Sequence, residues 1–259
     1  MRKQVSVNEN SVGTLARGLD VLEMFSSASA EFSQTEISQM LGLPMPTVHR
    51  LVAMLTERGW LDRDPASRRL RPGIEMVRLV PALIGGMRLP ELARPRLIGL
   101  ASELRETVNL AILQGAEIVY VLSESADRLL TPHVTVGMRL PAHCTALGKC
   151  LLAQLPEDVA RVALGDEPYE RRTERTLTTW TSLAEELSAI REAGVSISEE
   201  EYEVGLVSVA VPVRWLHGPG TGAINVSLPA GRATVEFRDR LTQRLLQAAG
   251  ELSVPSARR

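Results

Sequence analysis

The chain has 259 residues, a formal net charge of -2, 44% hydrophobic residues and 23% charged residues. This length suffices for one large domain or two ordinary ones, and the composition is that of a globular protein rather than a disordered or membrane-spanning one. The nearly neutral charge does not indicate nucleic-acid or membrane binding, and two cysteines, Cys144 and Cys150, exclude a disulfide framework and fit a reducing compartment.

The N-terminal segment predicts a leader followed by a helix. Residues 1–11 lack the apolar stretch of a signal peptide and are expected to form a disordered leader. The longest nearly apolar run, residues 79–87, is too short to span a bilayer, so we expect a cytoplasmic protein. Residues 14–25 have helical spacing, which predicts a core-facing side made of Leu15, Leu19, Leu22 and Phe25.

A second helix is predicted to begin at a capping box. Ser33 and Glu36 have the spacing at which each side chain accepts the backbone amide proton of the other residue. Gly42 is a suitable C-terminal cap. The apolar side of this helix is expected to consist of Ile37, Met40 and Leu41.

A third helix is predicted over residues 45–58, directly after a short turn. Pro44 and Pro46 are tolerated at its start because first-turn amides have no partner within the helix. Gly59 ends it, and residues 60–64 and 68–73 then read as two short strands of a hairpin. The expected core positions of the helix are Val48, Leu51, Val52 and Leu55.

Three helices followed by a hairpin have the order of a winged helix-turn-helix, whose second motif helix reads the major groove with its first turns. From Pro44 to Arg71 there are six Arg against three acidic residues, so positive charge is concentrated here. The alternative is a bundle helix whose arginines form a solvated face. The predicted DNA-binding residues are Pro44, Met45, Pro46, Thr47, His49 and Arg50 in the helix start, and Arg68, Arg69 and Arg71 in the wing.

The remaining chain predicts a connector helix and a mixed second domain. The connector begins at Gly73. Strands are expected over residues 108–113, 117–124, 133–136, 195–197, 206–215 and 222–228, and helices over residues 97–106, 144–155, after Pro156, 182–193 and 234–252. Ser182 and Glu185 have capping-box spacing, and Gly194 is the expected stop. This mixed order of helices and strands favours an α+β domain.

The sequence resembles the IclR type of bacterial transcriptional regulator. "SVGTLARGLDVLEMF" and "TEISQMLGLPMPTVHRLVAMLTERGWLDRDP" match its DNA-binding domain, while "LPAHCTALGKCLLAQLP", "EEEYEVGLVSVAVPV" and "GAINVSLPAGR" match its effector-binding domain in order. The resemblance implies a winged helix-turn-helix over residues 12–73, a linker helix over 74–90 and a GAF-like domain with a curved antiparallel sheet over 91–255. It also implies dimers or dimers of dimers, and regulation by a small organic or aromatic acid.

The resemblance further implies an effector cavity. Small residues at the start of a helix leave room for a carboxylate to bind the first-turn amides, which have no partner within the helix. Asn225 and Ser227 are two positions apart and so lie on one face of a strand. Interior polar groups that simply satisfy each other are the alternative. The implied effector-binding residues are His143, Thr145, Ala146, Leu147, Ser198, Leu206, Ser208, Asn225 and Ser227.

Two departures from the family pattern bear on specificity. Ser198, Ser208 and Asn225 stand where several members that bind small oxoacids have Asp, Cys and Ser, which predicts a less negative pocket and a larger or aromatic acid. Met45 and Pro46 replace the usual polar pair in the recognition turn, which changes the expected operator.

Other chemistry has little support in the sequence. His143, Cys144 and Cys150 lack zinc-site spacing, and no phosphate loop, paired-carboxylate motif or nucleophile elbow occurs, so no catalytic residue, metal or cofactor is predicted. The sequence therefore predicts a ligand-responsive regulator that binds double-stranded operator DNA as a homodimer or homotetramer. The alternatives are a small-molecule-processing enzyme with an accessory helix-turn-helix, and a sensor that binds only protein.

Overall fold

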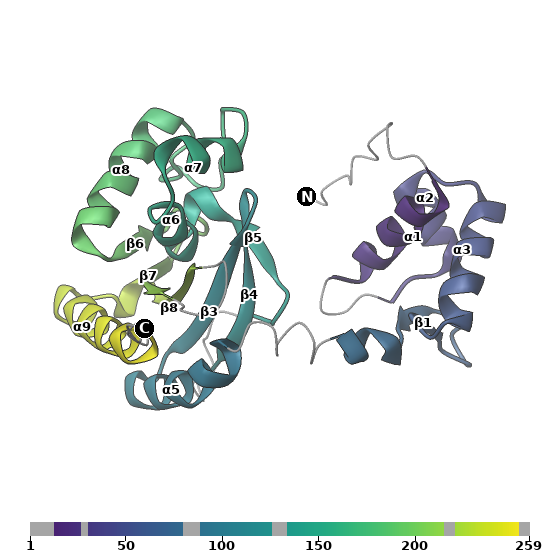
Figure 1. Ribbon diagram of the computed structural model, residues 1–259, viewed down its shortest axis with the longest axis horizontal. Coiled ribbons are helices and arrows are strands. Elements are labelled where there is room, and N and C mark those ends of the chain that lie inside the picture. The colour runs from purple at the N-terminus through teal and green to yellow at the C-terminus, as the bar shows by residue number, and fades with distance from the viewer. Residues whose placement is uncertain (1–12, 27–30, 80–88, 126–133, 215–220, 254–259) are drawn as a thin grey trace, which may run out of the picture. The chain divides into compact units, whose positions relative to one another are not determined.

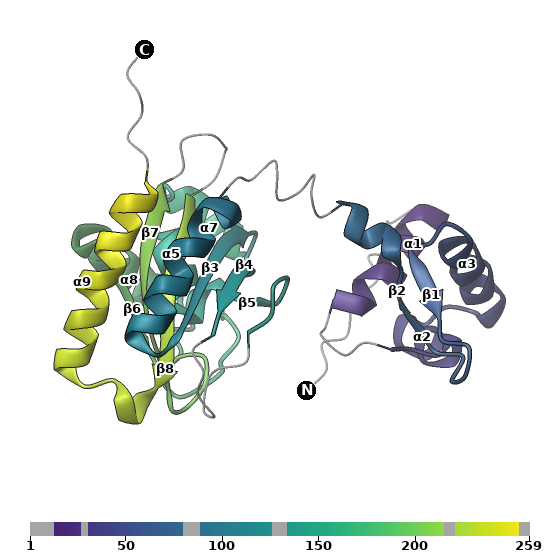
Figure 2. The ribbon, with the colours of Figure 1, turned by 90° about the horizontal axis from the view of Figure 1, so that it is seen from below.

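The computed structural model describes residues 13–26, 31–79, 89–125, 134–214 and 221–253. The chain divides into two compact units, Met1–Gly86 and Met87–Arg259, each with its own core (Figures 1 and 2). We call them the N-terminal unit and the C-terminal unit. Among the described residues, no helix has the length and hydrophobicity needed to cross a bilayer.

The N-terminal unit packs three helices against a hairpin. Its elements are α1 (Thr14–Glu23), η1 (Met24–Ser26), α2 (Gln34–Leu41), α3 (Met45–Glu57), β1 (Leu61–Arg63) and β2 (Leu70–Pro72), followed by helical residues 74–79. The predicted hairpin is confirmed, and Phe32 adds an isolated bridge to Leu70 that the sequence did not indicate. The rest of the predicted connector helix lies outside the described residues.

The turn between α2 and α3 is fixed by local hydrogen bonds. The predicted capping box is confirmed, since the Ser33 amide donates to Glu36 Oε2 at 2.8 Å and the Glu36 amide donates to Ser33 Oγ at 3.2 Å. Gly42 adopts a left-handed φ of 64°, and the Ser38 hydroxyl donates to the Leu43 carbonyl at 2.6 Å. These bonds set where α3 starts relative to α2.

The predicted core side of α1 is partly wrong. Leu15 and Leu19 are 77% and 51% exposed, whereas Val21 and Phe25 are buried. The reason is that α1 faces α3 with the side that carries Gly18, where an added Cβ would be in ordinary contact, 4.0 Å, with Leu51 Cδ2. Leu15 and Leu19 lie away from this side and are exposed, and in α2 Met40 is likewise exposed while Ile37 and Leu41 are buried.

The C-terminal unit is an α+β domain built on one antiparallel sheet. The strands lie in the order β5-β4-β3-β8-β7-β6. The elements are α5 (Leu89–Leu104), β3 (Thr107–Gln114), β4 (Glu117–Glu124), β5 (Arg139–Pro141), η2 (Ala142–Cys144), α6 (Ala146–Leu152), α7 (Glu157–Leu164), α8 (Trp180–Ala193), β6 (Ser196–Glu199), β7 (Leu206–Arg214), β8 (Thr221–Pro229), η3 (Ala230–Arg232) and α9 (Val235–Leu252). The predicted fold class, with its curved antiparallel sheet, is confirmed.

Alternation along the central strands separates two cores. On β7, the buried side chains Val207, Val209, Val211 and Val213 pack with α5 and α9. Ser208 and Ala210 face the layer that contains α6, α7 and α8 (Figure 1). On β8, Asn225 and Ser227 face that same layer. Because small and polar side chains cover this face, the sheet and α6 leave space between them.

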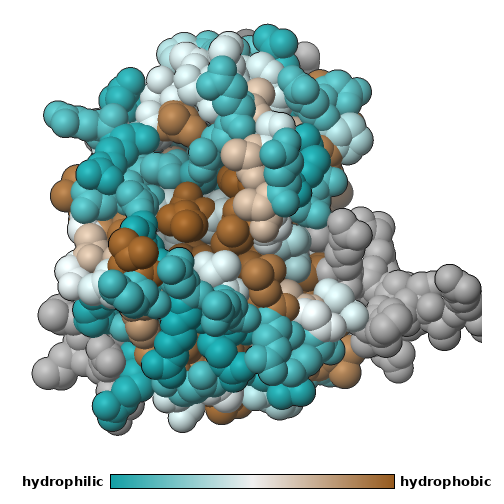
Figure 3. All heavy atoms as spheres, turned by 90° about the vertical axis from the view of Figure 1, so that its left-hand side faces the viewer, coloured by the Kyte–Doolittle hydropathy of each residue, from teal (hydrophilic) through white to brown (hydrophobic). Residues whose placement is uncertain are grey.

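The face of this unit that carries α8, α9 and the edge strand β6 is hollowed. Apolar side chains gather in the hollow, and polar side chains surround it (Figure 3). A groove of about 380 Å³ in this unit is lined mainly by charged residues, among them Lys149, Glu186 and Glu201.

Three sequence predictions about element ends are wrong. Residues 134–136 form no strand, and the third strand is Arg139–Pro141 instead. Helix α6 begins at Ala146, because Thr145 is its N-cap and residues 142–144 form a short 3₁₀ turn. Helix α8 begins at Trp180 with Thr179 as N-cap, so Ser182 is not the capping residue but lies in the first turn, where its amide donates to the Thr179 hydroxyl. Gly194 does end the helix.

Candidate DNA-binding surface and ligand cavity

Helix α3 presents its first turns to solvent. Val48, Leu51 and Val52 are buried in the core of the N-terminal unit, which anchors the helix by one side. On the other side His49 and Arg50 are exposed and Thr47 is half-buried. Pro44, Met45 and Pro46 are exposed at the helix start, and the Met45 amide occupies the first helical position, where no intrahelical carbonyl reaches it.

The three wing arginines differ in what they contact. Arg71 Nε and Nη2 donate to Asp62 Oδ2 at 3.0 and 2.7 Å. Arg69 Nη2 donates to Glu36 Oε2 at 2.9 Å and to the Glu31 carbonyl at 2.7 Å. Arg68, at the exposed tip with a φ of 60°, has no ion-pair partner within the described chain. Of the three wing arginines, Arg68 is therefore the one that can bind an anion without first breaking an ion pair.

The Arg71 pair also affects the acid beside it. The hydrogen bonds from Arg71 hold the pKa of Asp62 below its usual range, with a smaller contribution from the Arg63 amide. Asp62 therefore stays ionised at neutral pH, and Arg71 keeps its intradomain partner.

The C-terminal unit contains a cavity of about 370 Å³ between α6, the sheet and the β6–β7 loop. Its volume falls in the range of small-molecule sites. Eight of the nine residues implied as effector-binding line it, namely Thr145, Ala146, Leu147, Ser198, Leu206, Ser208, Asn225 and Ser227. His143 does not, because its Nε2 contacts the Glu170 carbonyl at 2.9 Å and its ring packs on Tyr169.

The helix side of the cavity is fixed by Thr145 and Gly148. The Thr145 hydroxyl accepts from the Gly148 amide at 3.2 Å and donates to the Pro141 carbonyl at 3.1 Å. A Cβ on Gly148 would stand 2.2 Å from the Ala142 carbonyl oxygen, so only glycine permits this close approach. The amides of Ala146 and Leu147 open the helix beside the cavity, without intrahelical acceptors.

The sheet side of the cavity offers neutral polar groups. The hydroxyls of Ser208 and Ser227 lie 2.7 Å apart, and Asn225 Nδ2 donates to Ser227 Oγ at 2.8 Å. Two tyrosines, Tyr120 and Tyr202, complete the wall. Burial raises the pKa of Tyr120, so its phenol stays protonated. The described lining includes one carboxylate, Glu203, and neither Lys nor Arg.

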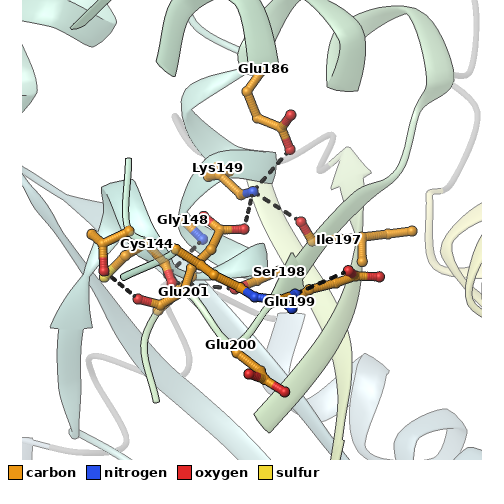
Figure 4. A network of polar contacts seen from close by, with 12 residues as sticks. Cys144, Gly148, Lys149, Glu186, Ile197, Ser198, Glu199, Glu200 and Glu201 are labelled. Carbon is orange, nitrogen blue, oxygen red and sulfur yellow. Dashed lines mark hydrogen bonds and ion pairs between the residues drawn. The ribbon is translucent and has the colours of Figure 1, made fainter. Parts of the chain in front are cut away.

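A buried ammonium ties α6 to the loop that forms the cavity wall (Figure 4). Lys149 is 1% exposed, and its Nζ donates to Glu201 Oε1 at 2.6 Å, to Glu186 Oε1 at 2.9 Å and to the Ile197 carbonyl at 2.9 Å. Glu201 directly precedes the cavity-lining residues 202–206. The hydroxyls of Thr173 and Thr176 fasten the same loop by donating to the carbonyls of Glu200 and Glu201 at 2.7 Å each.

The residues that suggested a metal or thiol site do not form one. Burial raises the pKa of Cys144 and of Cys150 to about 12, so both remain thiols. Burial lowers the pKa of His143, which leaves its ring neutral. Across the described ranges, no group of three or more His, Cys, Asp or Glu is placed to hold a metal ion.

Sequence reasoning missed Tyr120, Tyr202 and Lys149. The signal for Lys149 was present, since it is one of only two lysines, Lys3 and Lys149, in a chain otherwise basic through Arg, and it stands within the apolar run "CTALGKCLLAQL". A lone charge inside such a helix points to a buried, paired group. The tyrosines had no comparable local signal, because whether they face the cavity depends on how β4 and the β6–β7 loop are placed in the fold.

Comparisons with known proteins agree with this organisation. Residues 14–65 match the IclR helix-turn-helix domain, and residues 82–254 match the bacterial transcriptional regulator IclR C-terminal domain. The chain is 34% identical over 234 residues to the Pca regulon regulatory protein of Pseudomonas putida, covering 90% of this chain and 79% of that protein. It is 29% identical to the transcriptional repressor IclR of Escherichia coli, covering 94% and 89% of the two chains.

A solved structure supports the same comparison. The fold is similar, with a TM-score of 0.81 and 26% identity, to that of an IclR homologue from Microbacterium hydrocarbonoxydans in complex with 4-hydroxybenzoate, covering 93% of this chain and 98% of the homologue.

Proposed function

Because the chain belongs to the IclR family of bacterial transcriptional regulators, we propose that it binds operator DNA through the start of α3 and the β1–β2 hairpin, and that an organic acid in its cavity modulates this binding. Family membership makes it a DNA-binding transcriptional regulator with an effector-binding domain, and not an enzyme. The observation that carries the proposal is that eight of the nine residues implied as effector-binding line one cavity.

The cavity favours a monocyclic aromatic carboxylate. A relative is solved with 4-hydroxybenzoate. In this chain Tyr120 and Tyr202 offer aromatic contacts, and the opening amides of α6 offer hydrogen bonds to a carboxylate. Neutral hydroxyl and amide groups on the sheet then face the opposite end of the ring. Glu203 and the absence of Lys and Arg from the described lining disfavour polyanions.

We propose that DNA binding and effector binding belong to different units of the chain. We assign residues 12–73 to DNA binding, 74–90 to a linker and 91–255 to effector binding. Repression fits the names of several relatives, including the repressor IclR. A cytoplasmic location follows from the proposed contact with DNA.

Replacing Arg50 by Ala is expected to weaken operator binding by about 1–3 kcal/mol, because the proposed binding mode brings Arg50 to a base or phosphate in the major groove. Folding is expected to stay unchanged, since the side chain is exposed. Fluorescence anisotropy with DNA from upstream of the protein's own gene measures this. Arg58→Ala, exposed just after the far end of the same helix, is the matched control. If Arg50→Ala protects the operator in a footprinting assay as well as the wild type does, the recognition helix is misassigned.

The logarithm of DNA affinity falls with the logarithm of salt concentration, and each phosphate contact on duplex DNA contributes about 0.9 to the steepness of this fall. Replacing Arg68 by Ala is therefore expected to make the fall shallower by about 0.9. Arg69 and Arg71 already have acidic partners, so their single replacements are expected to change the slope less. The measurement is a titration at several salt concentrations. A slope that stays the same after all three are replaced would show that the hairpin does not touch DNA.

A dimer is expected at micromolar concentration, because one recognition helix makes too few contacts for operator affinity. Apolar side chains left exposed on the N-terminal unit support self-association, namely Leu15, Leu19, Ile74 and Val77. Sedimentation velocity is expected to give a dimer or tetramer, and Leu19→Glu is expected to weaken it. Val162→Glu, on exposed α7, is the control. A monomer with and without DNA would contradict the proposal.

A further inference from the structure

Five polar side chains form a continuous row across four neighbouring strands, β4, β3, β8 and β7. We call it the polar row, and in order it consists of Ser123, Asn109, Asn225, Ser227 and Ser208. Strand register aligns it, since Asn109 pairs with both Ser123 and Asn225, and Ser208 pairs with Ser227. The last three residues line the cavity and the first two do not, so the row extends from the cavity into the sheet.

The donors of the polar row all point toward the cavity. Ser123 Oγ donates to Asn109 Oδ1 at 2.7 Å, and Asn109 Nδ2 donates to Asn225 Oδ1 at 2.9 Å. Asn225 Nδ2 in turn donates to Ser227 Oγ at 2.8 Å. Asn109 is fully buried, so water does not compete with these bonds. Aligned hydrogen bonds in a buried site polarise one another, which strengthens the donor at the end of the row.

The serine pair at the end of the row keeps one hydroxyl hydrogen for the cavity. Ser227 Oγ already accepts from Asn225, and the bond between Ser208 and Ser227 uses one of their two hydroxyl hydrogens. Whichever serine donates, the other hydroxyl hydrogen has no acceptor in the row. Both serines line the cavity, so this hydrogen is available to a ligand oxygen.

We propose that Asn109, which does not line the cavity, is a positioning residue that makes the serine pair a donor and so selects an effector with an acceptor oxygen at the end opposite its carboxylate. This inference rests on the proposed function, because it assumes that the effector occupies the cavity with its carboxylate at α6. Asn109 acts through the orientation of the Asn225 amide, with which it shares the hydrogen bond of 2.9 Å.

Replacing Asn109 by Asp reverses the row. In Asn109→Asp the ionised carboxylate only accepts hydrogen bonds, so the Asn225 amide turns to donate to it and presents its oxygen to Ser227. Ser227 then donates to Asn225, and Ser208 donates to Ser227. Both hydroxyl hydrogens are now used, and the pair offers the cavity only acceptors. A protonated acid would instead donate to Asn225 and keep the wild-type row, which is why the measurement is made at alkaline pH.

The test compares three ligands of equal charge, 4-methoxybenzoate, 4-aminobenzoate and 4-methylbenzoate, on the full chain by calorimetry at about pH 8. Their para groups respectively accept, donate and do neither. The wild type is expected to bind the methoxy compound about tenfold more tightly than the amino compound, the factor for one interior hydrogen bond. Asn109→Asp is expected to reverse this preference. A general repulsion by the new carboxylate weakens all three alike and leaves the ratio unchanged.

Two further variants complete the test. Asn225→Asp changes only the serine end of the row, because the carboxylate still accepts from Asn109 Nδ2 and now requires Ser227 to donate to it. It therefore tests the serine pair as the selecting group if Asn109→Asp does not fold. Ser196→Ala removes another buried serine hydroxyl, outside the cavity lining, and is expected to keep the wild-type ratio. Binding of the benzoates with one and the same ratio in the wild type and both Asp variants overturns the inference and leaves the proposed function standing. Failure of every benzoate to bind the wild type overturns the proposed effector class, and the inference with it.

Discussion

Replacing Lys149 by Met is expected to destabilise the C-terminal unit by about 3–5 kcal/mol, the usual result of removing one partner from a buried ion pair. The Lys149 ammonium has three hydrogens and three acceptors, Glu201, Glu186 and the Ile197 carbonyl. Glu201 is only 8% exposed, so without Lys149 its carboxylate is left buried and uncompensated. Urea unfolding followed by circular dichroism measures the loss.

The loss is expected to depend on pH. Burial already raises the pKa of Glu201, and this effect exceeds the opposing one from the Lys149 ammonium. In Lys149→Met the opposing effect is gone, so the folded-state pKa rises further above the unfolded value. Stability is then retained below the unfolded pKa and lost as pH rises through the folded pKa. The variant is therefore expected to lie closer to the wild type at acidic than at alkaline pH.

Two controls separate this explanation from a general packing defect. Glu186→Gln removes the partner whose side chain is 37% exposed, and is expected to cost less than about 1 kcal/mol. The double variant Lys149→Met with Glu201→Gln removes both buried charges and is expected to recover most of the lost stability. A double variant no more stable than Lys149→Met would show that the damage is steric and not electrostatic.

Replacing Asn225 by Leu is expected to abolish effector-linked stabilisation, which amounts to about 2.7 kcal/mol at a ligand concentration one hundred times Kd. The structure adds a second effect. Asn225 accepts from Asn109 Nδ2, and Leu leaves that fully buried donor without its acceptor, at a cost of about 1–3 kcal/mol even without ligand. Thermal unfolding with and without 4-hydroxybenzoate measures both effects.

Operator binding serves as the internal reference for Asn225→Leu. Asn225 belongs to the C-terminal unit and the proposed DNA contacts to the N-terminal unit, so the folded variant is expected to bind operator DNA with normal affinity. Its complex is also expected to stay intact when the effector is added. A ligand that releases wild-type protein from DNA and stabilises Asn225→Leu equally well would place the effector elsewhere.

The sequence by itself determined the elements whose signals are local. The helix over 45–57 follows from apolar spacing, the start of α2 from the Ser33–Glu36 capping box, and the ends of α2 and α8 from Gly42 and Gly194. Strands β7 and β8 follow from alternation. These features depend on hydrogen bonds and on the spacing of apolar side chains within a few residues of one another. They can therefore be predicted from the sequence without knowing the fold.

Only the tertiary structure decided which side of each element meets which neighbour. Leu15 and Leu19 have the spacing of core residues, yet they are exposed because α1 faces α3 with the side that carries Gly18 and Val21. The wing arginines look equivalent in sequence. Arg69 pairs with Glu36 of α2 and Arg71 with Asp62 of β1, whereas Arg68 has no acidic partner among the described residues. In each case the deciding contact joins residues from different elements, which local spacing does not specify.

Some features of the cavity follow from the local sequence, and others arise only in the tertiary structure. Alternation on β8 put Asn225 and Ser227 on one face, whereas their partners Asn109 and Ser208 come from β3 and β7 and meet them only through strand register. Lys149 stands in an apolar helix, and Glu201, 52 positions away, reaches it only once the β6–β7 loop folds back over α6. Buried polar groups are stable only when paired, and in this domain the partners are brought together by the sheet and its loops.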